Sequence, residues 1–325
     1  MGYRAEKEKT EQKLKRIKYV LLSVVLLLVA ALGIFSAFVP AETWKYYFSL
    51  PSVTARQEGE LRIHFIDVGQ GDSAFIEFPD GQTLLIDGGN TSAQSEESLM
   101  RYLNALNIQR IDHVLLTHTD ADHCGGLDKV LQYKEVGKLY LPSLENVQVN
   151  AAYAQTYECA VKQGVSIALG KRGVKISSNE QSYTYSFTIV YPYQLSEAES
   201  DVSSVAWLDY HGVSALFTGD ASTLEENALA AESGQGLLDI YGVHLDSTEI
   251  LKVSHHGSRY STSEEFLQYL NVETAIISCG KENAYGHPHD ETIARLQQCG
   301  VQIHRTDERG DIVLTIKSDG TYSVE

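Results

Sequence analysis

The fold is decided by the stretch IDHVLLTHTDADHCGG, residues 111–126. Its first part, Ile111–Thr117, is a mainly apolar run typical of a buried strand. Four side chains of metal-binding type follow within six positions, at His118, Asp120, Asp122 and His123. A solvated loop would explain these residue types but not their density between a buried strand and the pair Gly125-Gly126. Because glycine lets backbones approach closely, a helix can start there beside a site for one or two cations.

A second apolar run, Leu216–Thr218, ends in Gly219-Asp220 and so delivers one carboxylate at a strand end. Taken alone, Asp220 is explained as well by a turn or a helix N-cap before Ala221-Ser222 as by a role in metal binding. Beside the first cluster it becomes a candidate bridge, since one carboxylate can hold two cations about 3.5–4 Å apart.

The segment Lys252–Ser258 runs from a strand into the pair His255-His256. Neighbouring side chains point in different directions, so we expect one histidine to bind metal and the other to contact substrate. We assign His256 to the metal and His255 to catalysis, although the sequence alone does not decide between them. A surface loop with two histidines is the alternative.

The segment Asn283–His289 contributes a further histidine, His287, held between a glycine and a proline. This position suits a donor to a developing negative charge, and we assign His287 a catalytic role. His289 is interpreted as the start of the next helix.

Two earlier segments, DVGQGD at 67–72 and LIDGG at 85–89, contain aspartates beside glycines. Neither has the GxGxxG or GK[ST] spacing of a nucleotide-binding loop. A tight turn in which aspartate caps backbone N–H groups is as good an interpretation as a direct role. We expect Asp67, Asp72 and Asp87 to orient the metal ligands by hydrogen bonding.

In order and spacing, these motifs resemble the metallo-β-lactamase superfamily, and within it the hydrolase domain of the ComEC-type DNA-uptake (competence) proteins. The resemblance spans residues 60–325 and rests on DVGQGD, DGG at 87–89, the cluster at 118–123, TGD at 218–220, HHGS at 255–258 and YGHP at 285–288. It implies an α/β fold, a four-layer αββα sandwich, with the metals at the mouth between two sheets.

The sequence departs from the superfamily pattern in two places. Most members have His where Asp120 stands, although the ComEC branch shares the Asp, and a hard oxygen ligand favours Mn²⁺ or Mg²⁺ over strict Zn²⁺ preference. The usual His between the cluster and Asp220 has no evident counterpart, since Asp201-Val202-Ser203-Ser204 occupies that interval and His211 lies on an expected turn. We therefore expect two divalent ions, Mn²⁺ or Zn²⁺, with Mg²⁺ as a further candidate.

The N-terminal region predicts a membrane anchor. Val20–Val39 is a run of twenty uncharged residues, long enough to cross a hydrocarbon layer of about 30 Å and longer than the apolar part of a cleavable signal. Residues 1–18 hold seven Lys/Arg against three Glu, and Trp44, Tyr46 and Tyr47 lie on the other side. By the positive-inside rule the N-terminus is cytoplasmic and the catalytic domain is extracytoplasmic.

We expect four parts: a basic cytoplasmic tail at 1–18, a transmembrane signal anchor at 19–39, a stalk at 40–60 and a hydrolase domain at 61–325. One anchor cannot form a channel, so DNA uptake is not expected.

The whole chain carries a net charge of −17 and residues 1–18 carry +4, which leaves −21 for the rest. Such a charge disfavours nonspecific duplex binding but not phosphodiester chemistry at a cationic metal site. The four cysteines include no CxxC pair, which argues against a thiolate zinc cluster.

Within the hydrolase domain, helical patterns alternate with strand patterns. We expect helices at Ala93–Leu106, Ala151–Gln163 and Asp290–Gln298, and strands that include Thr83–Ile86 and Val205–Tyr210. A further helix should start after Ser261 or Thr262, with Glu264 or Glu265 completing a capping box. A final hairpin is expected to pair Ile312–Ile316 with Tyr322–Val324.

The sequence thus predicts a membrane-anchored, metal-dependent phosphodiesterase or nuclease. One ion would be held by His118, Asp120 and Asp220, and the other by Asp122, His123, Asp220 and one of His255 and His256. A metal-bridging hydroxide would attack phosphorus, with Asp122 orienting the nucleophile. The preferred substrate is a phosphodiester, with nucleic acid as one candidate. The alternative is a catalytically silent metal-binding receptor or scaffold, and the sequence disfavours a β-lactam or thioester hydrolase.

Overall fold

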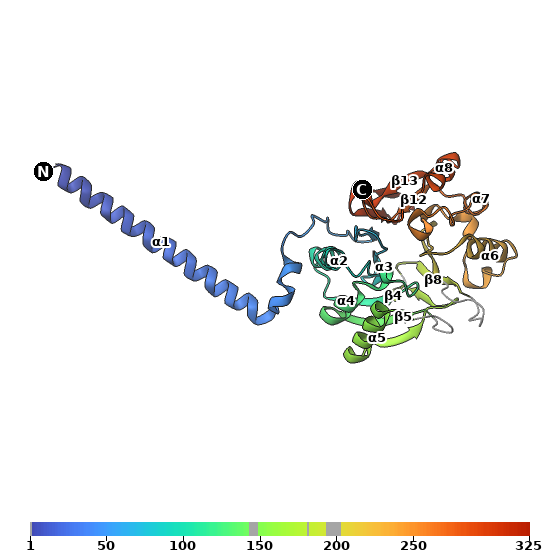
Figure 1. Ribbon diagram of the computed structural model, residues 1–325, viewed down its shortest axis with the longest axis horizontal. Coiled ribbons are helices and arrows are strands. Elements are labelled where there is room, and N and C mark those ends of the chain that lie inside the picture. Colours follow the sequence, from blue (N-terminus) through green and yellow to red (C-terminus); the bar gives the residue numbers. More distant parts are fainter. Residues whose placement is uncertain (1, 143–148, 181, 193–202) are drawn as a thin grey trace. The chain divides into compact units, whose positions relative to one another are not determined.

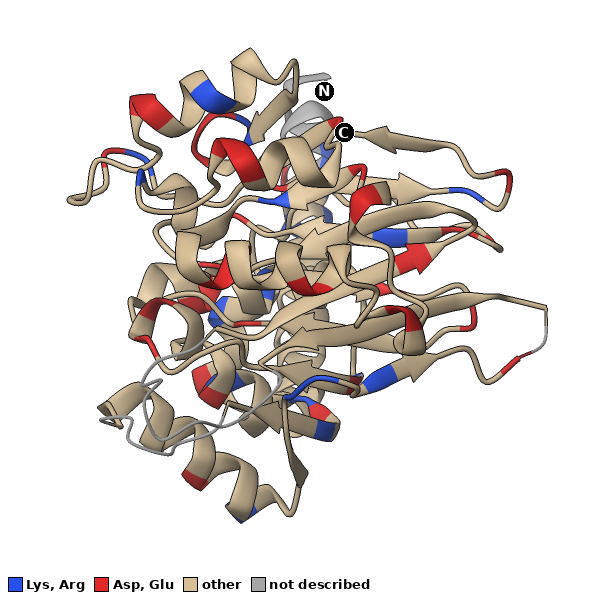
Figure 2. Ribbon diagram, turned by 90° about the vertical axis from the view of Figure 1, so that its right-hand side faces the viewer, with Lys and Arg blue, Asp and Glu red and all other residues tan. Residues whose placement is uncertain are grey.

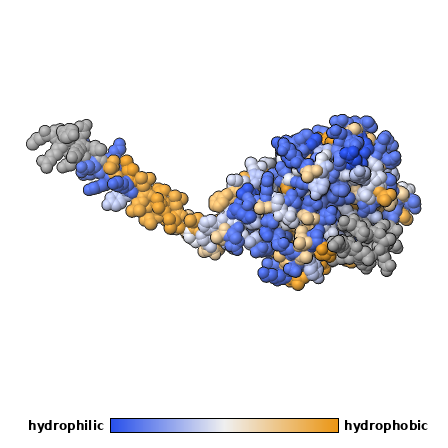
Figure 3. Space-filling view, in the orientation of Figure 1, coloured by the Kyte–Doolittle hydropathy of each residue, from blue (hydrophilic) through white to orange (hydrophobic). Residues whose placement is uncertain are grey.

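The computed structural model describes residues 2–142, 149–180, 182–192 and 203–325, which form two compact units, Met1–Ser49 and Leu50–Glu325. The first unit contains helix α1 (Gly2–Phe38) and the 3₁₀ helix η1 (Ala41–Tyr47). Within α1, Glu11–Phe38 is long and apolar enough to cross a membrane, and its most apolar window is 0% buried. Figure 3 shows these apolar residues as a continuous band along the helix. Phe35 packs its ring against Trp44 and Tyr47 of η1.

The second unit contains two mixed β-sheets that pack face to face, with helices on their outer sides (Figure 1). The first sheet has the strand order β15-β14-β1-β2-β3-β4-β5-β6 and the second β13-β12-β11-β10-β9-β8-β7. This is the expected α/β αββα sandwich.

The strands of the first sheet are β1 (Leu61–Phe65), β2 (Ala74–Glu77), β3 (Thr83–Ile86), β4 (Arg110–Leu115), β5 (Glu135–Leu141), β6 (Ser166–Leu169), β14 (Ile312–Ile316) and β15 (Tyr322–Val324). Those of the second are β7 (Lys175–Ser177), β8 (Tyr185–Tyr191), β9 (Val205–Tyr210), β10 (Val213–Phe217), β11 (Ile250–Lys252), β12 (Thr274–Ile277) and β13 (Gln302–Arg305). The helices beside the first sheet are α2 (Ala93–Ala105), α3 (Ala121–Cys124), α4 (Leu127–Tyr133) and α5 (Ala151–Gln163). Those beside the second are α6 (Thr223–Gly234), α7 (Glu264–Leu270) and α8 (Asp290–Gln298). Short helical turns complete the unit at η2 (Asp239–Tyr241), η3 (Leu245–Ser247), η4 (Ser254–Gly257) and α9 (Thr306–Arg309).

The main core lies between the two sheets, where their inward-facing side chains meet. Phe65 of β1 stacks near Phe217 with 6.2 Å between ring centroids, and Phe78, just after β2, stacks on Tyr185 of β8 at 4.3 Å. A second core, between the second sheet and its helices, includes Leu229, Phe266 and Leu296. α6, α7 and α8 therefore each bury apolar side chains against this sheet, as amphipathic surface helices do.

Parallel pairing positions the ends of the strands that matter for function. In the first sheet β3, β4 and β5 run parallel, and in the second β10, β11, β12 and β13 do. The carboxyl ends of parallel strands lie at one edge of a sheet, where ligands commonly bind. Loops that follow β3, β4, β10, β11 and β12 can therefore meet at one edge of the sandwich.

Several expected elements have the observed bounds, including Thr83–Ile86, Ala151–Gln163, Val205–Tyr210 and the final hairpin. The expected cap of α7 was wrong. Ser263 is the N-cap and accepts from the N–H of Phe266, whereas Ser261 bonds to two upstream carbonyl groups and Thr262 adopts a left-handed conformation with φ 53°. The capping box lies instead at α6, where Ser222 pairs with Glu225. Asp220 is therefore not the N-cap of this helix.

Replacing Phe78 by Ala tests how the two sheets are joined. Phe78 is fully buried, so Phe78→Ala should lower the free energy of unfolding by about 3–5 kcal/mol through lost burial and a cavity. Leu224→Ala, at a side chain that is 82% exposed, should change it by less than about 0.5 kcal/mol. Denaturant unfolding of the detergent-solubilised chain measures both, and equal effects would show that this stacked pair does not hold the sheets together.

Candidate metal centre

The carboxylate of Asp220 lies among four histidine rings. Its oxygens are 3.7 Å from Nε2 of His118, 3.3 Å from Nε2 of His123, 3.6 Å from Nε2 of His255 and 3.7 Å from Nε2 of His256. The first two histidines follow β4 of the first sheet, and the last two follow β11 of the second. Asp220 itself follows β10, so this one side chain connects residues delivered by both sheets.

The first sheet supplies its residues through a short, tightly packed segment. Asp120 is the N-cap of α3, and Asp122 and His123 lie in that single turn, which follows β4. The segment approaches the backbone after β3 so closely that a Cβ at Gly125 would lie 2.0 Å from the carbonyl carbon of Asn90. Only glycine fits there. In the same segment, the ring centroids of His118 and His123 lie 4.0 Å apart.

The second sheet supplies His255 and His256 from η4, where both adopt left-handed backbone conformations, with φ 49° and 53°. His256 is 1% exposed and turns Nε2 toward Asp122, at 3.3 Å, and toward Asp220. Its Nδ1 lies 3.0 Å from the carbonyl oxygen of Ser278. The side chain of His255 is 46% exposed and lies at the rim. This geometry suits a ligand role for His256 and a substrate-facing role for His255.

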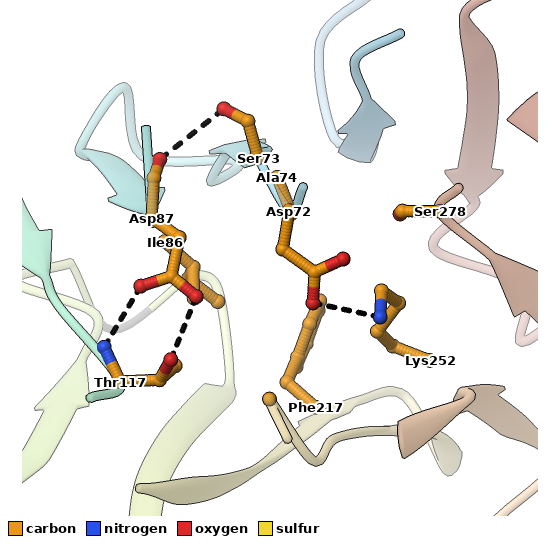
Figure 4. A pocket seen from close by; sticks show the side chains of 10 residues that line it. Asp72, Ser73, Ala74, Ile86, Asp87, Thr117, Phe217, Lys252 and Ser278 are labelled. Carbon is orange, nitrogen blue, oxygen red and sulfur yellow. Dashed lines mark hydrogen bonds and ion pairs between the residues drawn. The ribbon is translucent and has the colours of Figure 1, made fainter. Parts of the chain in front are cut away.

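Asp87 holds Thr117 and His123 in place by hydrogen bonds. Figure 4 shows its two bonds to Thr117. One carboxylate oxygen accepts from the backbone N–H of Thr117 at 2.8 Å, and the other accepts from the Thr117 hydroxyl at 2.7 Å. That second oxygen also lies 2.8 Å from Nδ1 of His123, which leaves Nε2 of His123 facing Asp220. Burial raises the pKa of Asp87, against the opposing effect of His123. Asp87 thus fixes the orientation of the His123 ring.

Asp72 contacts His256 much as Asp87 contacts His123. It also forms a buried ion pair with Lys252 at 2.7 Å (Figure 4). Its second oxygen lies 3.2 Å from Nδ1 of His256. Burial opposes ionisation of Asp72, but Lys252 and His256 outweigh it and hold its pKa below the ordinary value. Burial likewise opposes protonation of His256, while Asp220 and Asp72 raise its pKa to about 10. Sequence reasoning did not assign Lys252 a role. Its position as a lysine at the end of an apolar strand was the one feature of the sequence that could have indicated a role.

Glu226 of α6 is a second residue that sequence reasoning missed. Its carboxylate accepts from the Ser254 hydroxyl at 2.9 Å and from the backbone N–H groups of Thr262 and Ser263 at 2.6 and 3.1 Å. It therefore ties α6 to the start of the histidine loop and to the start of α7. Burial raises its pKa to about 7. A glutamate inside an otherwise ordinary helix gave no signal in the sequence.

The remaining candidates lie farther from Asp220. Asp120 has a side chain that is 54% exposed, with an oxygen 3.8 Å from Nε2 of His118. The ring of His287 lies 5.5 Å from that of His255 and 6.1 Å from that of His256. Asp67 points elsewhere, since its carboxylate accepts from the N–H of Gly69, which matches the turn interpretation.

Most superfamily members have a further histidine between the cluster at 118–123 and Asp220. In this chain serines stand in that part of the sequence. Ser203 accepts through its hydroxyl from the backbone N–H of Asp220 at 3.0 Å. Asp201 and Val202 lie outside the described residues. His211 occupies the turn between β9 and β10 with φ 53°, at the opposite end of β10 from Asp220.

The residues fit a site for divalent cations. Among the described residues, several buried ligand atoms have no hydrogen-bond partner: Nε2 of His118, His123 and His256, and Oδ1 of Asp220. Two overlapping groups, His118-His123-Asp220 and Asp122-His123-His256, each bring their ligand atoms within 4.8 Å of one another. Imidazole nitrogens and carboxylate oxygens are the donors that Zn²⁺ and Mn²⁺ accept. Orphaned polar atoms that converge in a buried place are costly unless a ligand satisfies them.

Comparison with known proteins agrees with this fold. Residues 66–178 match the model of the metallo-beta-lactamase superfamily. The fold of CmlA, a diiron beta-hydroxylase from Streptomyces venezuelae, superimposes with a TM-score of 0.50 at 13% identity, covering 81% of this chain and 55% of that one. The chain carries a metallo-beta-lactamase superfamily domain.

Within the superfamily, the chain is homologous to competence proteins of the ComEC type. It is 34% identical to ComE operon protein 3 of Bacillus subtilis over 285 residues, covering 82% of this chain and 34% of that protein. It is 29% identical to competence protein ComA of Neisseria gonorrhoeae, covering 78% of this chain and 32% of that protein. The chain thus spans about a third of the length of these relatives.

Removing the central carboxylate tests the metal centre. Asp220→Ala should weaken divalent-cation binding by more than about 10–100-fold, the loss usual even for residues that only orient ligands. Asp246→Ala, at an exposed carboxylate in η3, should bind like the unchanged chain. Calorimetric titration with Mn²⁺ and Zn²⁺ measures both, and unaltered affinity in Asp220→Ala would show that Asp220 is not a ligand.

The Lys252–Asp72 pair can be tested through stability. Lys252→Met keeps the apolar stem but leaves Asp72 buried without its cation, so the free energy of unfolding should fall by about 3–5 kcal/mol. Lys175→Met, at an exposed position of β7, is the control and should change it by less than about 0.5 kcal/mol. Denaturant titration measures the difference, and an unchanged free energy of unfolding in Lys252→Met would mean that the pair does not stabilise the fold.

Proposed function

We propose that this chain is a membrane-anchored, metal-dependent phosphodiesterase whose substrates include fragments of nucleic acid. The observation that carries the proposal is the position of Asp220 between two overlapping groups of metal-ligand atoms. One of its oxygens lies near His118, and the other lies near His123 and His256. One carboxylate shared by two cations is the arrangement that suits in-line displacement at phosphorus.

Each candidate residue then has a role. His118, Asp120 and Asp220 would hold one divalent ion, and Asp122, His123, Asp220 and His256 the other. When bound, such ions supply a nucleophile at neutral pH and neutralise charge on the phosphoryl oxygens. The oxygen preference of Asp120 favours Mn²⁺ or Mg²⁺, and the histidines keep Zn²⁺ as a candidate.

Three side chains, Asp122, His287 and His255, would act on the attacking water or on the substrate. Asp122 retains a side chain that is 27% exposed, and His256 and His123 lower its pKa against the effect of burial, so it stays ionised and can accept a proton from an attacking water. His287 has a pKa lowered to about 4 by burial and by the neighbouring histidines, so its ring is neutral and offers an N–H to a phosphoryl oxygen. His255, at the rim, is placed to contact the same oxygens.

The proposed membrane location of the protein rests on its N-terminal unit. We propose a basic cytoplasmic tail at 1–18, a transmembrane anchor at 19–39, a stalk at 40–60 and an extracytoplasmic hydrolase domain at 61–325. Support comes from the uncharged run Val20–Val39, most of which lies in helix α1, and from the seven cationic residues at positions 1–18 that precede this run.

The charge of the hydrolase domain bears on substrate size. Figure 2 shows acidic residues spread over its helices and loops. A surface dominated by negative charge repels a long polyanion, so short or single-stranded fragments suit the site better than duplex.

The activity can be tested with a chromogenic phosphodiester, bis(p-nitrophenyl) phosphate, offered with Mn²⁺, Mg²⁺ or Zn²⁺ after removal of metals by chelation. We expect metal-dependent turnover that Asp122→Ala lowers by at least about 10²–10³-fold, because one positioned proton acceptor contributes about 10²–10⁴-fold. The thermal unfolding of Asp122→Ala should remain cooperative, and Asp246→Ala should keep full turnover.

Metal binding without turnover of any phosphodiester would favour the alternative, a silent metal-binding receptor or scaffold. Turnover by Asp122→Ala at the rate of the unchanged chain would remove Asp122 from the mechanism.

A further inference from the structure

The loop after β12 presents an aromatic ring beside the metal centre. Tyr285 is 65% exposed, and its ring stacks on that of His287, with centroids 5.7 Å apart and planes at 20°. His287 in turn contacts His255 and His256, at 5.5 and 6.1 Å. The ring of His287 therefore neighbours both Tyr285 and the candidate ligand His256.

This loop is held in place by hydrogen bonds rather than by burial of the tyrosine. The carbonyl oxygen of the Asn283 side chain accepts from the backbone N–H groups of Tyr285 and His287, at 3.1 and 3.0 Å. At the start of the loop, the N–H of Gly280 donates to the side chain of Gln70 at 3.1 Å. A Cβ at Gly280 would lie 2.5 Å from the backbone nitrogen of Gln70, so the loop is packed directly on the segment 67–72. The ring pair is thus preorganised before any substrate arrives.

Single exposed aromatic residues are common and need no explanation. Tyr285 differs because it is nearly parallel to a second ring, stands on a fixed loop and lies one ring from the proposed reaction centre. A flat, uncharged surface in that place matches the face of a nucleobase. Base–aromatic stacking contributes about 1–3 kcal/mol per base and needs no cationic side chain. It therefore gives an acidic domain a means of holding a nucleotide that does not depend on attracting the phosphate backbone.

We propose that Tyr285, backed by His287, forms a base-stacking subsite that selects phosphodiesters carrying an unpaired nucleobase. The inference rests on the proposed phosphodiesterase function and specifies its substrate class. In a duplex the base faces are covered by neighbouring base pairs, so the subsite excludes duplex and accepts single strands, ends or short fragments. Bound there, the base positions the adjoining phosphodiester toward Asp220.

The test compares two labelled oligodeoxynucleotides of equal length, one of thymidine residues and one in which every residue is abasic. Both carry the same phosphates and differ only in the bases. Binding is measured by fluorescence anisotropy with the full chain in detergent and Mn²⁺, in the Asp122→Ala background so that nothing is cleaved. We expect the thymidine strand to bind more tightly, and Tyr285→Ala to weaken that binding by about tenfold or more without changing binding of the abasic strand. Tyr285→Phe, which keeps the ring, should bind as tyrosine does.

The matched control is Tyr157→Ala on α5, which removes another exposed tyrosine and should leave both affinities unchanged. Equal binding of the two strands, or an equal loss for both in Tyr285→Ala, would overturn the subsite, since the second result is that of a purely structural tyrosine. Because binding is read without turnover, base-dependent binding in a chain that hydrolyses no phosphodiester would support the subsite while contradicting the proposed function.

Discussion

The structure depends on one carboxylate placed where the two halves of the sandwich meet. Asp220 follows a strand of the second sheet and faces His118 and His123, which follow a strand of the first. Burial opposes its ionisation, but His123 and His256 outweigh burial and hold the pKa of Asp220 well below its ordinary value. A buried anion among imidazoles of both sheets is stable only while they keep their register, so core packing and site geometry are coupled. The interlocking Phe78–Tyr185 and Phe65–Phe217 pairs maintain that register.

Around this centre, a set of buried polar groups fixes the orientation of each ring. Asp87 directs His123, and Asp72, itself paired with Lys252, directs His256. Glu226 holds the loop in which the histidine pair adopts left-handed backbone conformations. Buried charges without partners would destabilise the fold, whereas Asp87, Asp72, Lys252 and Glu226 are each paired or hydrogen-bonded. These contacts keep the candidate ligand atoms close together, so that the side chains would need to move little when a cation binds.

Much of this arrangement could be predicted from the sequence, because strand ends followed by dense His and Asp are a local signal. The cluster at 118–123, Asp220 and the histidine pair were identified in that way, and the structure brings them together. Lys252 and Glu226 could not be found so, since their partners are distant in the chain and only the folded packing shows that they are buried. Asp67 could not be told from Asp72 by composition, because both flank the same glycines. The cap of α7 was misplaced because several adjacent hydroxyl residues were equally suitable in sequence, and backbone conformation decided among them.

The account makes one claim on which the others rest: Asp220 is shared by cations held from both sheets. The most direct measurement is anomalous diffraction at the manganese edge from crystals grown with Mn²⁺. We predict two neighbouring peaks, both within bonding distance of Asp220, one beside His118 and the other beside Asp122 and His256. Peaks remote from Asp220, or full occupancy by a single ion that it does not contact, would contradict the account.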